Sequence, residues 1–314
     1  MRFLLVFLII LASAPASAAE FKLDARYSDV NKDLVADIPL AVKDLREPAS
    51  LTFGYPPLDD NALMATAWAG FMKHLEKVTG KQVVYEAFSS AEAEVAAMRS
   101  GKLDVAGFSA GAVPLAVSCA GARPFAVMAA ASGEFGYQME IITPDNSDIK
   151  RIEDIKGKTL AFTAKTSNSG YKAPKALLSS QFGLTEGPDY TAVFTGKHDN
   201  SIRGVVRGEL AVAAVASEVR LSMEGRGEVK PGDVRVIYRS QTFPTTGYAV
   251  SHDLTPALQT QIAQAFFTFN WEGSSLAKGF SKSGYARFVP ITFREDWSVI
   301  RQVDEASDAS LICP

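Results

Sequence analysis

The sequence predicts an α/β protein of two domains that are joined by a hinge of two chain segments. Short apolar or β-branched runs alternate with helical patterns along most of the chain, which is typical of sheets with mainly parallel strands. A turn-rich stretch at 144–147 divides this alternation into two series. A strand at 248–251 and a long amphipathic helix after it are expected to return to the first series, so that the chain crosses twice between the domains.

Each expected element rests on a local pattern. Residues 59–77 carry apolar side chains at helical spacing, with Asp60 or Asn61 as a cap and Gly80 as a stop. The other elements expected in the first domain (51–143 and 248–314) are strands at 51–55, 82–88, 103–108, 125–128, 137–143 and 248–251, and helices at 91–99 and 256–271. The second domain (144–247) is expected to contain strands at 159–163, 191–194, 210–215 and 234–238, and helices that begin near 166 and 198.

The N-terminal segment has the pattern of a secretory signal peptide, which we expect to comprise residues 1–18. Arg2 precedes an apolar run at 3–11 that is too short to span a bilayer, and Ala16-Ser17-Ala18 matches a cleavage site. The mature chain is therefore expected in the periplasm. Residues 19–50 are polar and interrupted by prolines, and we expect them to form an extended arm.

The charge balance limits the choice of partners. The chain has 32 basic and 35 acidic side chains, with a formal net charge of −3 and no basic tract. Nucleic acid is therefore excluded as an expected partner. An acidic protein that binds an anion must do so with local donors rather than with its overall field. We expect a monomer.

The sequence contains two cysteines, Cys119 and Cys313. In an oxidising compartment they are expected to form one disulfide, which would tie the C-terminus to the first domain. The alternative is a pair of free buried thiols.

A possible calcium loop lies within the arm. The oxygen-bearing side chains of Asp29, Asn31, Asp33 and Asp37 have a spacing that can surround a Ca²⁺ ion. The loop departs from the EF-hand pattern, because leucines replace both its turn glycine and its bidentate glutamate. The alternative is a solvated acidic loop, and no other cofactor is expected.

A candidate anion site begins at Ser167-Asn168-Ser169-Gly170. These residues open a predicted helix, whose first turn has unpaired N–H groups and the positive end of the helix dipole. His198 stands at the start of a second predicted helix and would add a donor that can carry charge. Two such helix starts suit a small tetrahedral oxyanion. The alternative for His198 is a solvated residue at a helix cap.

Three segments resemble a known family. They are Asp154–Phe162, the Ser-x-Ser-Gly-Tyr-x-x-Pro segment at 167–174, and Phe-x-Gly-x-His-Asp at 194–199. Together they are similar to substrate-binding proteins of phosphonate, phosphite and phosphate ABC importers, over residues 51–301. The resemblance implies the type II periplasmic binding fold and an oxyanion held in the interdomain cleft by Ser167, Asn168, Ser169 and His198. It also implies no catalysis and delivery of the ligand to a permease in the inner membrane.

The chain departs from this family where the rest of the ligand is recognised. Phe108 stands in place of a tyrosine, and Thr246 replaces an aspartate that can hold a ligand amine. These replacements argue against an aminophosphonate ligand. Phe108, Ser109, Thr245, Thr246 and Tyr248 are our candidates for contacts with the ligand substituent.

Two other functions fit parts of the sequence. Gly107-Phe108-Ser109-Ala110-Gly111 matches the Gly-x-Ser-x-Gly turn of α/β hydrolases, which would make Ser109 the nucleophile of an exported serine hydrolase, with His252 as its histidine. Against this, the motif comes only about three strands into the domain, earlier than in such enzymes. The third alternative is a ligand-sensing subunit of the same fold.

Overall fold

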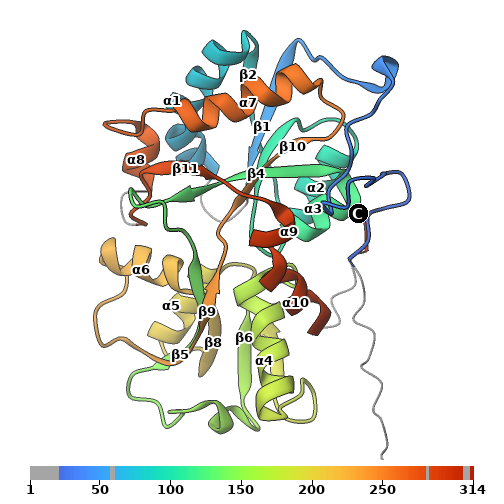
Figure 1. Ribbon diagram of the computed structural model, residues 1–314. Coiled ribbons are helices and arrows are strands. Elements are labelled where there is room, and N and C mark those ends of the chain that lie inside the picture. The colour runs from blue at the N-terminus through green and yellow to red at the C-terminus, as the bar shows by residue number, and fades with distance from the viewer. Residues whose placement is uncertain (1–20, 57–60, 281–282, 307–311) are drawn as a thin grey trace, which may run out of the picture.

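The computed structural model describes residues 21–56, 61–280, 283–306 and 312–314, so the expected signal peptide lies outside the described residues. Within them the chain forms two α/β lobes, one above the other in Figure 1. We call the part built on the six-stranded sheet the first lobe, and the part built on the five-stranded sheet the second lobe. The prediction of an α/β fold with two sheets is confirmed.

The first lobe has the strand order β11-β4-β10-β3-β1-β2. Its strands are β1 (Ser50–Tyr55), β2 (Gln82–Ala87), β3 (Val105–Phe108), β4 (Ala122–Ala129), β10 (Gly247–Ser251) and β11 (Arg287–Pro290). Its helices are α1 (Asn61–Thr79), α2 (Ala91–Arg99), α3 (Val113–Ala120), α7 (Pro256–Thr268), α8 (Ser275–Gly279) and α9 (Phe293–Asp296). Strand β1 pairs in parallel with β2 and β3, whereas β10 is antiparallel to both of its neighbours.

The second lobe has the strand order β7-β6-β8-β5-β9. Its strands are β5 (Tyr137–Pro144), β6 (Thr159–Phe162), β7 (Thr191–Phe194), β8 (Val212–Ala216) and β9 (Val234–Phe243). Its helical segments are η2 (Ile152–Ile155), η3 (Asn168–Lys172), α4 (Ala173–Phe182), α5 (His198–Val206) and α6 (Ser217–Gly225). Strand β6 is parallel to β7 and β8, and β5 is antiparallel to β8 and β9.

Strand β5 differs from the sequence expectation, which assigned residues 137–143 to the first domain. It lies between β8 and β9 of the second lobe, because its apolar residues complete that sheet. The change of sheet therefore falls between the end of β4 at Ala129 and the start of β5 at Tyr137. We propose that the chain passes between the lobes at residues 130–136 and 244–246.

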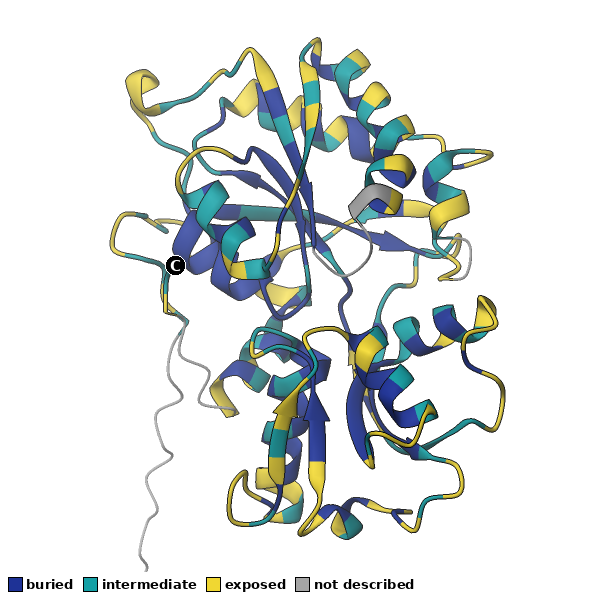
Figure 2. Cartoon of the chain, turned by 180° about the vertical axis from the view of Figure 1, so that it is seen from behind, coloured by how far each residue is buried: buried dark blue, intermediate teal, exposed yellow. Residues whose placement is uncertain are grey.

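The cores of both lobes lie along their sheets, where Figure 2 shows buried strands beneath helices whose outer faces are exposed. In the first lobe, the apolar face of α1 contributes Trp68 and Phe71, which pack on Phe53 of β1. Full burial of such side chains stabilises a fold by about 1.5–3 kcal/mol each.

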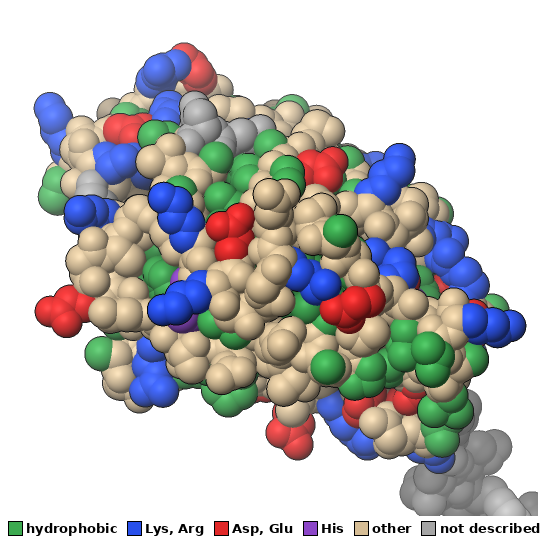
Figure 3. Space-filling model, turned by 90° about the horizontal axis from the view of Figure 1, so that it is seen from above, with side chains coloured by type: hydrophobic (Ala, Val, Ile, Leu, Met, Phe, Trp, Pro, Cys, Tyr) green, Lys and Arg blue, Asp and Glu red, His purple; other side chains and the backbone are tan. Residues whose placement is uncertain are grey.

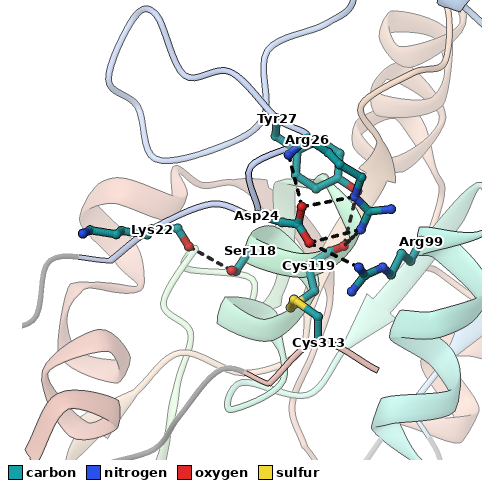
Figure 4. The surroundings of a disulfide bond; sticks show 8 residues. All are labelled: Lys22, Asp24, Arg26, Tyr27, Arg99, Ser118, Cys119 and Cys313. Carbon is teal, nitrogen blue, oxygen red and sulfur yellow. Dashed lines mark hydrogen bonds and ion pairs between the residues drawn. A yellow bond between two sulfur atoms is a disulfide. The ribbon is translucent and has the colours of Figure 1, made fainter.

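The arm runs along the first lobe and covers the only disulfide among the described residues (Figure 4). Cys119 and Cys313 are bonded, at a sequence separation of 194, so the predicted disulfide is confirmed. Arg26 and Tyr27 of the arm both donate hydrogen bonds to the Cys119 carbonyl oxygen. The end of α3, the arm and the C-terminal tail therefore meet at one point.

The possible calcium loop uses its acidic side chains to hold its own backbone. Asp29 accepts from the N–H groups of Asp33 and Leu34, and Asp37 accepts from the N–H of Val30. In the described part of the chain, no group of three or more His, Cys, Asp or Glu side chains is placed to hold a metal ion. The described helices also include none with the length and apolarity of a membrane span.

Candidate functional site

A cavity of about 170 Å³ lies between the two lobes. The first lobe lines it with the start of α2 and with the residues before α3, and the second lobe with the residues that precede η3, α5 and α6. Thr245 and Thr246 line it from the segment that joins β9 to β10. Of the predicted ligand-binding residues, Ser109, Ser167, Asn168, Ser169, His198, Thr245 and Thr246 border this cavity.

The helix start at Ser167 forms as predicted. Ser167 is the N-cap of η3, and its Oγ accepts a hydrogen bond from the Gly170 N–H at 3.0 Å. A side chain at Gly170 would collide with Thr163 and Ser167, because an added Cβ would lie 1.9 Å from Thr163 Oγ1. Segment η3 continues directly into α4, so the dipole of both points at the cavity.

Tyr137, which the sequence analysis missed, lies against this helix start. Asn168 Nδ2 donates to its Oη at 3.3 Å, and the side chain and backbone of Ser169 also interact with it. Burial raises the pKa of Tyr137 to about 12, so its hydroxyl stays protonated. Its oxygen accepts from Asn168, and Tyr137 itself borders the cavity. No pattern in the sequence indicated that Tyr137 borders the site, because the strand that begins with it was expected in the first domain.

His198 differs from the expectation of a donor that can carry charge. Its Nδ1 accepts from the Ala216 N–H at 3.1 Å, and its Nε2 lies 3.4 Å from Ser167 Oγ. Burial lowers the pKa of His198 to about 4. The ring is therefore neutral at pH 7, with its proton on Nε2 toward Ser167 and the cavity. It is a hydrogen-bond donor but not a cation.

Three buried polar atoms at the cavity have no hydrogen-bond partner within the described structure. They are Thr163 Oγ1, Asn168 Oδ1 and Thr245 Oγ1. The first two residues are 2% exposed and Thr245 is 3% exposed, and all three line the cavity. Because buried polar groups are almost always paired, these atoms indicate where polar atoms of a ligand would lie.

The Gly-x-Ser-x-Gly segment owes its glycines to close packing. A Cβ on Gly111 would lie 2.4 Å from Thr166 O and 2.6 Å from Asn168 N, across the lobes. A Cβ on Gly107 would lie 2.8 Å from Thr246. Both positions therefore exclude a side chain for steric reasons, and the motif needs no nucleophile to explain it.

The other parts of the hydrolase alternative are not brought together. Ser109 lies before the N-terminal end of α3, whereas His252 packs at the other end, against Gly121 and Tyr27. The eight residues of α3 span about 12 Å.

Phe108 does not have the position that was expected for a contact with the ligand substituent, because it is fully buried in the first lobe and does not border the cavity.

Glu218 is a second residue that the sequence analysis missed. It lies in the first turn of α6, borders the cavity, and accepts a hydrogen bond from Tyr285 Oη at 2.9 Å. Tyr285 precedes β11, so this bond joins the two lobes. The available signal was an acidic residue two positions after the buried strand β8, in the first turn of a helix.

The cleft continues beyond the small cavity. An adjoining space of about 930 Å³ shares His198, Glu218, Thr245 and Thr246 with it. The cleft therefore has room for a substituent larger than a methyl group.

On the face shown in Figure 3, acidic and basic side chains are interspersed, so that face offers no broad positive surface to an anion.

The chain is similar to known proteins over most of its length. Residues 53–297 match the family described as ABC transporter, phosphonate, periplasmic substrate-binding protein. The chain is 26% identical over 275 residues to the phosphate-import protein PhnD of Mycolicibacterium smegmatis, covering 83% of this chain and 84% of that protein.

Two solved structures share the fold. One is a binding protein component of an ABC phosphonate transporter from Pseudomonas aeruginosa, with a TM-score of 0.72, 22% identity, and coverage of 82% of this chain and 86% of that one. The other is PhnD1 from Prochlorococcus marinus in complex with methylphosphonate, with a TM-score of 0.72, 17% identity, and coverage of 84% and 100%.

Proposed function

Since the chain belongs to the family of periplasmic substrate-binding proteins of phosphonate ABC transporters, we propose that its interlobe cavity binds a phosphonate, phosphite or phosphate and presents it to the importer's permease. The observation that carries this proposal is the meeting of the η3 helix start and His198 at one small cavity. Both lobes contribute to that cavity, so ligand contacts would favour a closed form. One chain supplies the whole site, which fits a monomer.

The oxyanion would be held by neutral donors. We assign this role to the Ser167 hydroxyl, the first-turn N–H groups of η3, the His198 Nε2–H and the Tyr137 hydroxyl. A hydrogen bond to a charged group contributes about 1.5–3 kcal/mol, so a few such bonds offset the desolvation of a small anion. No cofactor takes part in this scheme. The periplasmic location that it requires agrees with the family.

The residues near the substituent change one part of the sequence hypothesis. The loss of an aspartate at Thr246 argued against a ligand amine, but Glu218 supplies a carboxylate at the same cavity. A carboxylate beside an anion site accepts hydrogen bonds and repels a second anion. We therefore propose that the ligand carries a donor on its substituent, facing Glu218.

Calorimetry with phosphate, phosphite, methylphosphonate and 2-aminoethylphosphonate tests the proposal. We expect at least one to bind, and the variants Ser167→Ala and His198→Ala to weaken that binding at least tenfold. Unchanged affinity in both variants would place the ligand elsewhere. Covalent labelling of Ser109 by a fluorophosphonate, with no binding of the four anions, would instead support the hydrolase alternative.

A further inference from the structure

The C-terminal part of the chain makes a third connection between the lobes. Trp297 is fully buried in the first lobe, where its Nε1 donates to the Ala110 carbonyl oxygen at 2.9 Å. Helix α10 (Ser298–Ala306) begins directly after it and lies beside α4 and η3 of the second lobe (Figure 1). Cys313, seven positions after the end of α10, is bonded to Cys119 of α3 in the first lobe. Helix α10 is thus tied to the first lobe on both sides.

Lys172 joins this helix to the anion-binding segment. Its side chain is buried, and its Nζ lies 2.9 Å from Asp304 Oδ1 of α10. The same ammonium group donates to the Gly111 carbonyl oxygen of the first lobe at 2.8 Å. The ammonium group of Lys172 therefore connects η3 to helix α10 and to the loop before α3.

These contacts hold Lys172 in one place and leave it no role in attracting the ligand. Lys172 does not border the cavity, and its ammonium group is directed to Asp304 and Gly111. A buried ammonium group is tolerated only while such partners remain, since an unpaired buried charge costs several kcal/mol. Burial raises the pKa of Asp304, and the neighbouring Lys172 opposes this shift.

We propose that α10, anchored to the first lobe by Trp297 and by the Cys119–Cys313 disulfide, forms a strap that keeps the anion-binding segment against the first lobe, with Lys172 as the positioning residue. The backbones of Gly111 and Asn168 already lie too close for a Cβ, so a rotation that parts them lengthens the Lys172 bond as well. Hydrogen bonds weaken steeply with such lengthening. The strap therefore favours the closed form before any ligand arrives. The proposal rests on the proposed function only in taking the interlobe cavity as the binding site.

The radius of gyration of the ligand-free protein, measured by small-angle X-ray scattering, tests the strap. We expect the double variant Lys172→Met/Asp304→Asn to be more open than the original chain. Its affinity for methylphosphonate, or for whichever of the four anions binds best, should fall about tenfold, since part of the binding free energy must then close the lobes. The matched control Glu140→Gln/Arg220→Met removes a buried ion pair within the second lobe and should leave the ligand-free radius unchanged.

A second variant keeps the test decisive if the first does not fold. Cys119→Ser/Cys313→Ser releases the tail without touching the cavity, and it should open the ligand-free protein in the same direction. An unchanged radius in every variant that folds would overturn the strap. If the original chain binds none of the anions, the proposed function fails, but the radius comparison still decides the strap.

Discussion

The hydroxyl of Tyr285 donates a hydrogen bond at 2.9 Å to Glu218, and this bond joins the two lobes beside the cavity. Tyr285 belongs to the first lobe and Glu218 to the second. The carboxylate at the edge of the anion site is therefore oriented by the opposite lobe, and its position depends on closure.

Glu218 should determine which ligands are accepted. We expect Glu218→Gln to weaken binding of 2-aminoethylphosphonate about tenfold or more, because the charge opposite the ammonium group is lost. Binding of methylphosphonate should change less than threefold, because it has no amine. Calorimetry with both compounds measures the difference. Equal losses for the two ligands would show that Glu218 acts through closure and not through the substituent.

His198 should make the free energy of unfolding depend on pH. It should not attract the anion by charge at pH 7, because its ring is neutral there. The pKa of the folded ring is about 4, below its ordinary value of 6.5, so the unfolded chain binds more protons between these values. Stability from this group is complete above pH 6.5 and is lost as the pH falls toward 4, by about 3 kcal/mol at most. Urea unfolding at several pH values measures this loss.

The variant His198→Asn provides the comparison for that measurement. It keeps a polar side chain but cannot titrate, so the loss of stability between pH 6.5 and 4 should become smaller. An equally steep loss in the variant would mean that other groups cause it.

Gly111 should be intolerant of any side chain. We expect Gly111→Ala to weaken anion binding at least tenfold, because the added methyl group meets the backbone of Thr166 and Asn168 and keeps the lobes apart. Ser109→Ala, two residues earlier, removes only a hydroxyl and should have a smaller effect. If the affinity of Gly111→Ala matches that of the original chain, the close contact between the lobes is not needed for binding.

Most helices and strands could be predicted because their signals are local. Ser90 caps α2 within one turn, and the helix start at Ser167 is encoded by its own neighbours. The charge state of His198 could not be predicted, because it depends on the burial of the ring in the folded chain, where Nδ1 accepts from the N–H of Ala216 at the end of β8. The burial of Lys172 could not be predicted either, since Asp304 and Gly111 reach it only in the folded chain.

The antiparallel strands were harder to predict than the helices. Strand β10 is inserted between β3 and β4, and β5 between β8 and β9, so their partners come from distant parts of the chain. An apolar run of a few residues shows that a strand is buried but not which sheet receives it. The assignment of residues 137–143 failed at this point, and Tyr137 was missed with it.

Glu94 should make the first lobe less stable as the pH rises. Its carboxyl group is fully buried without a hydrogen-bond partner in the described structure, and burial raises its pKa well above 4.5. The unfolded chain loses this proton near its ordinary pKa, whereas the folded chain keeps it, so stability falls with rising pH above that value.

The variant Glu94→Gln cannot ionise and should be more stable than the original chain at pH 7, by about 1–3 kcal/mol. The exposed neighbour Glu92 provides the control, since Glu92→Gln should leave stability unchanged. Urea unfolding at pH 5 and pH 8 measures the effect, and a difference between Glu94→Gln and the original chain that does not grow with pH would contradict the prediction.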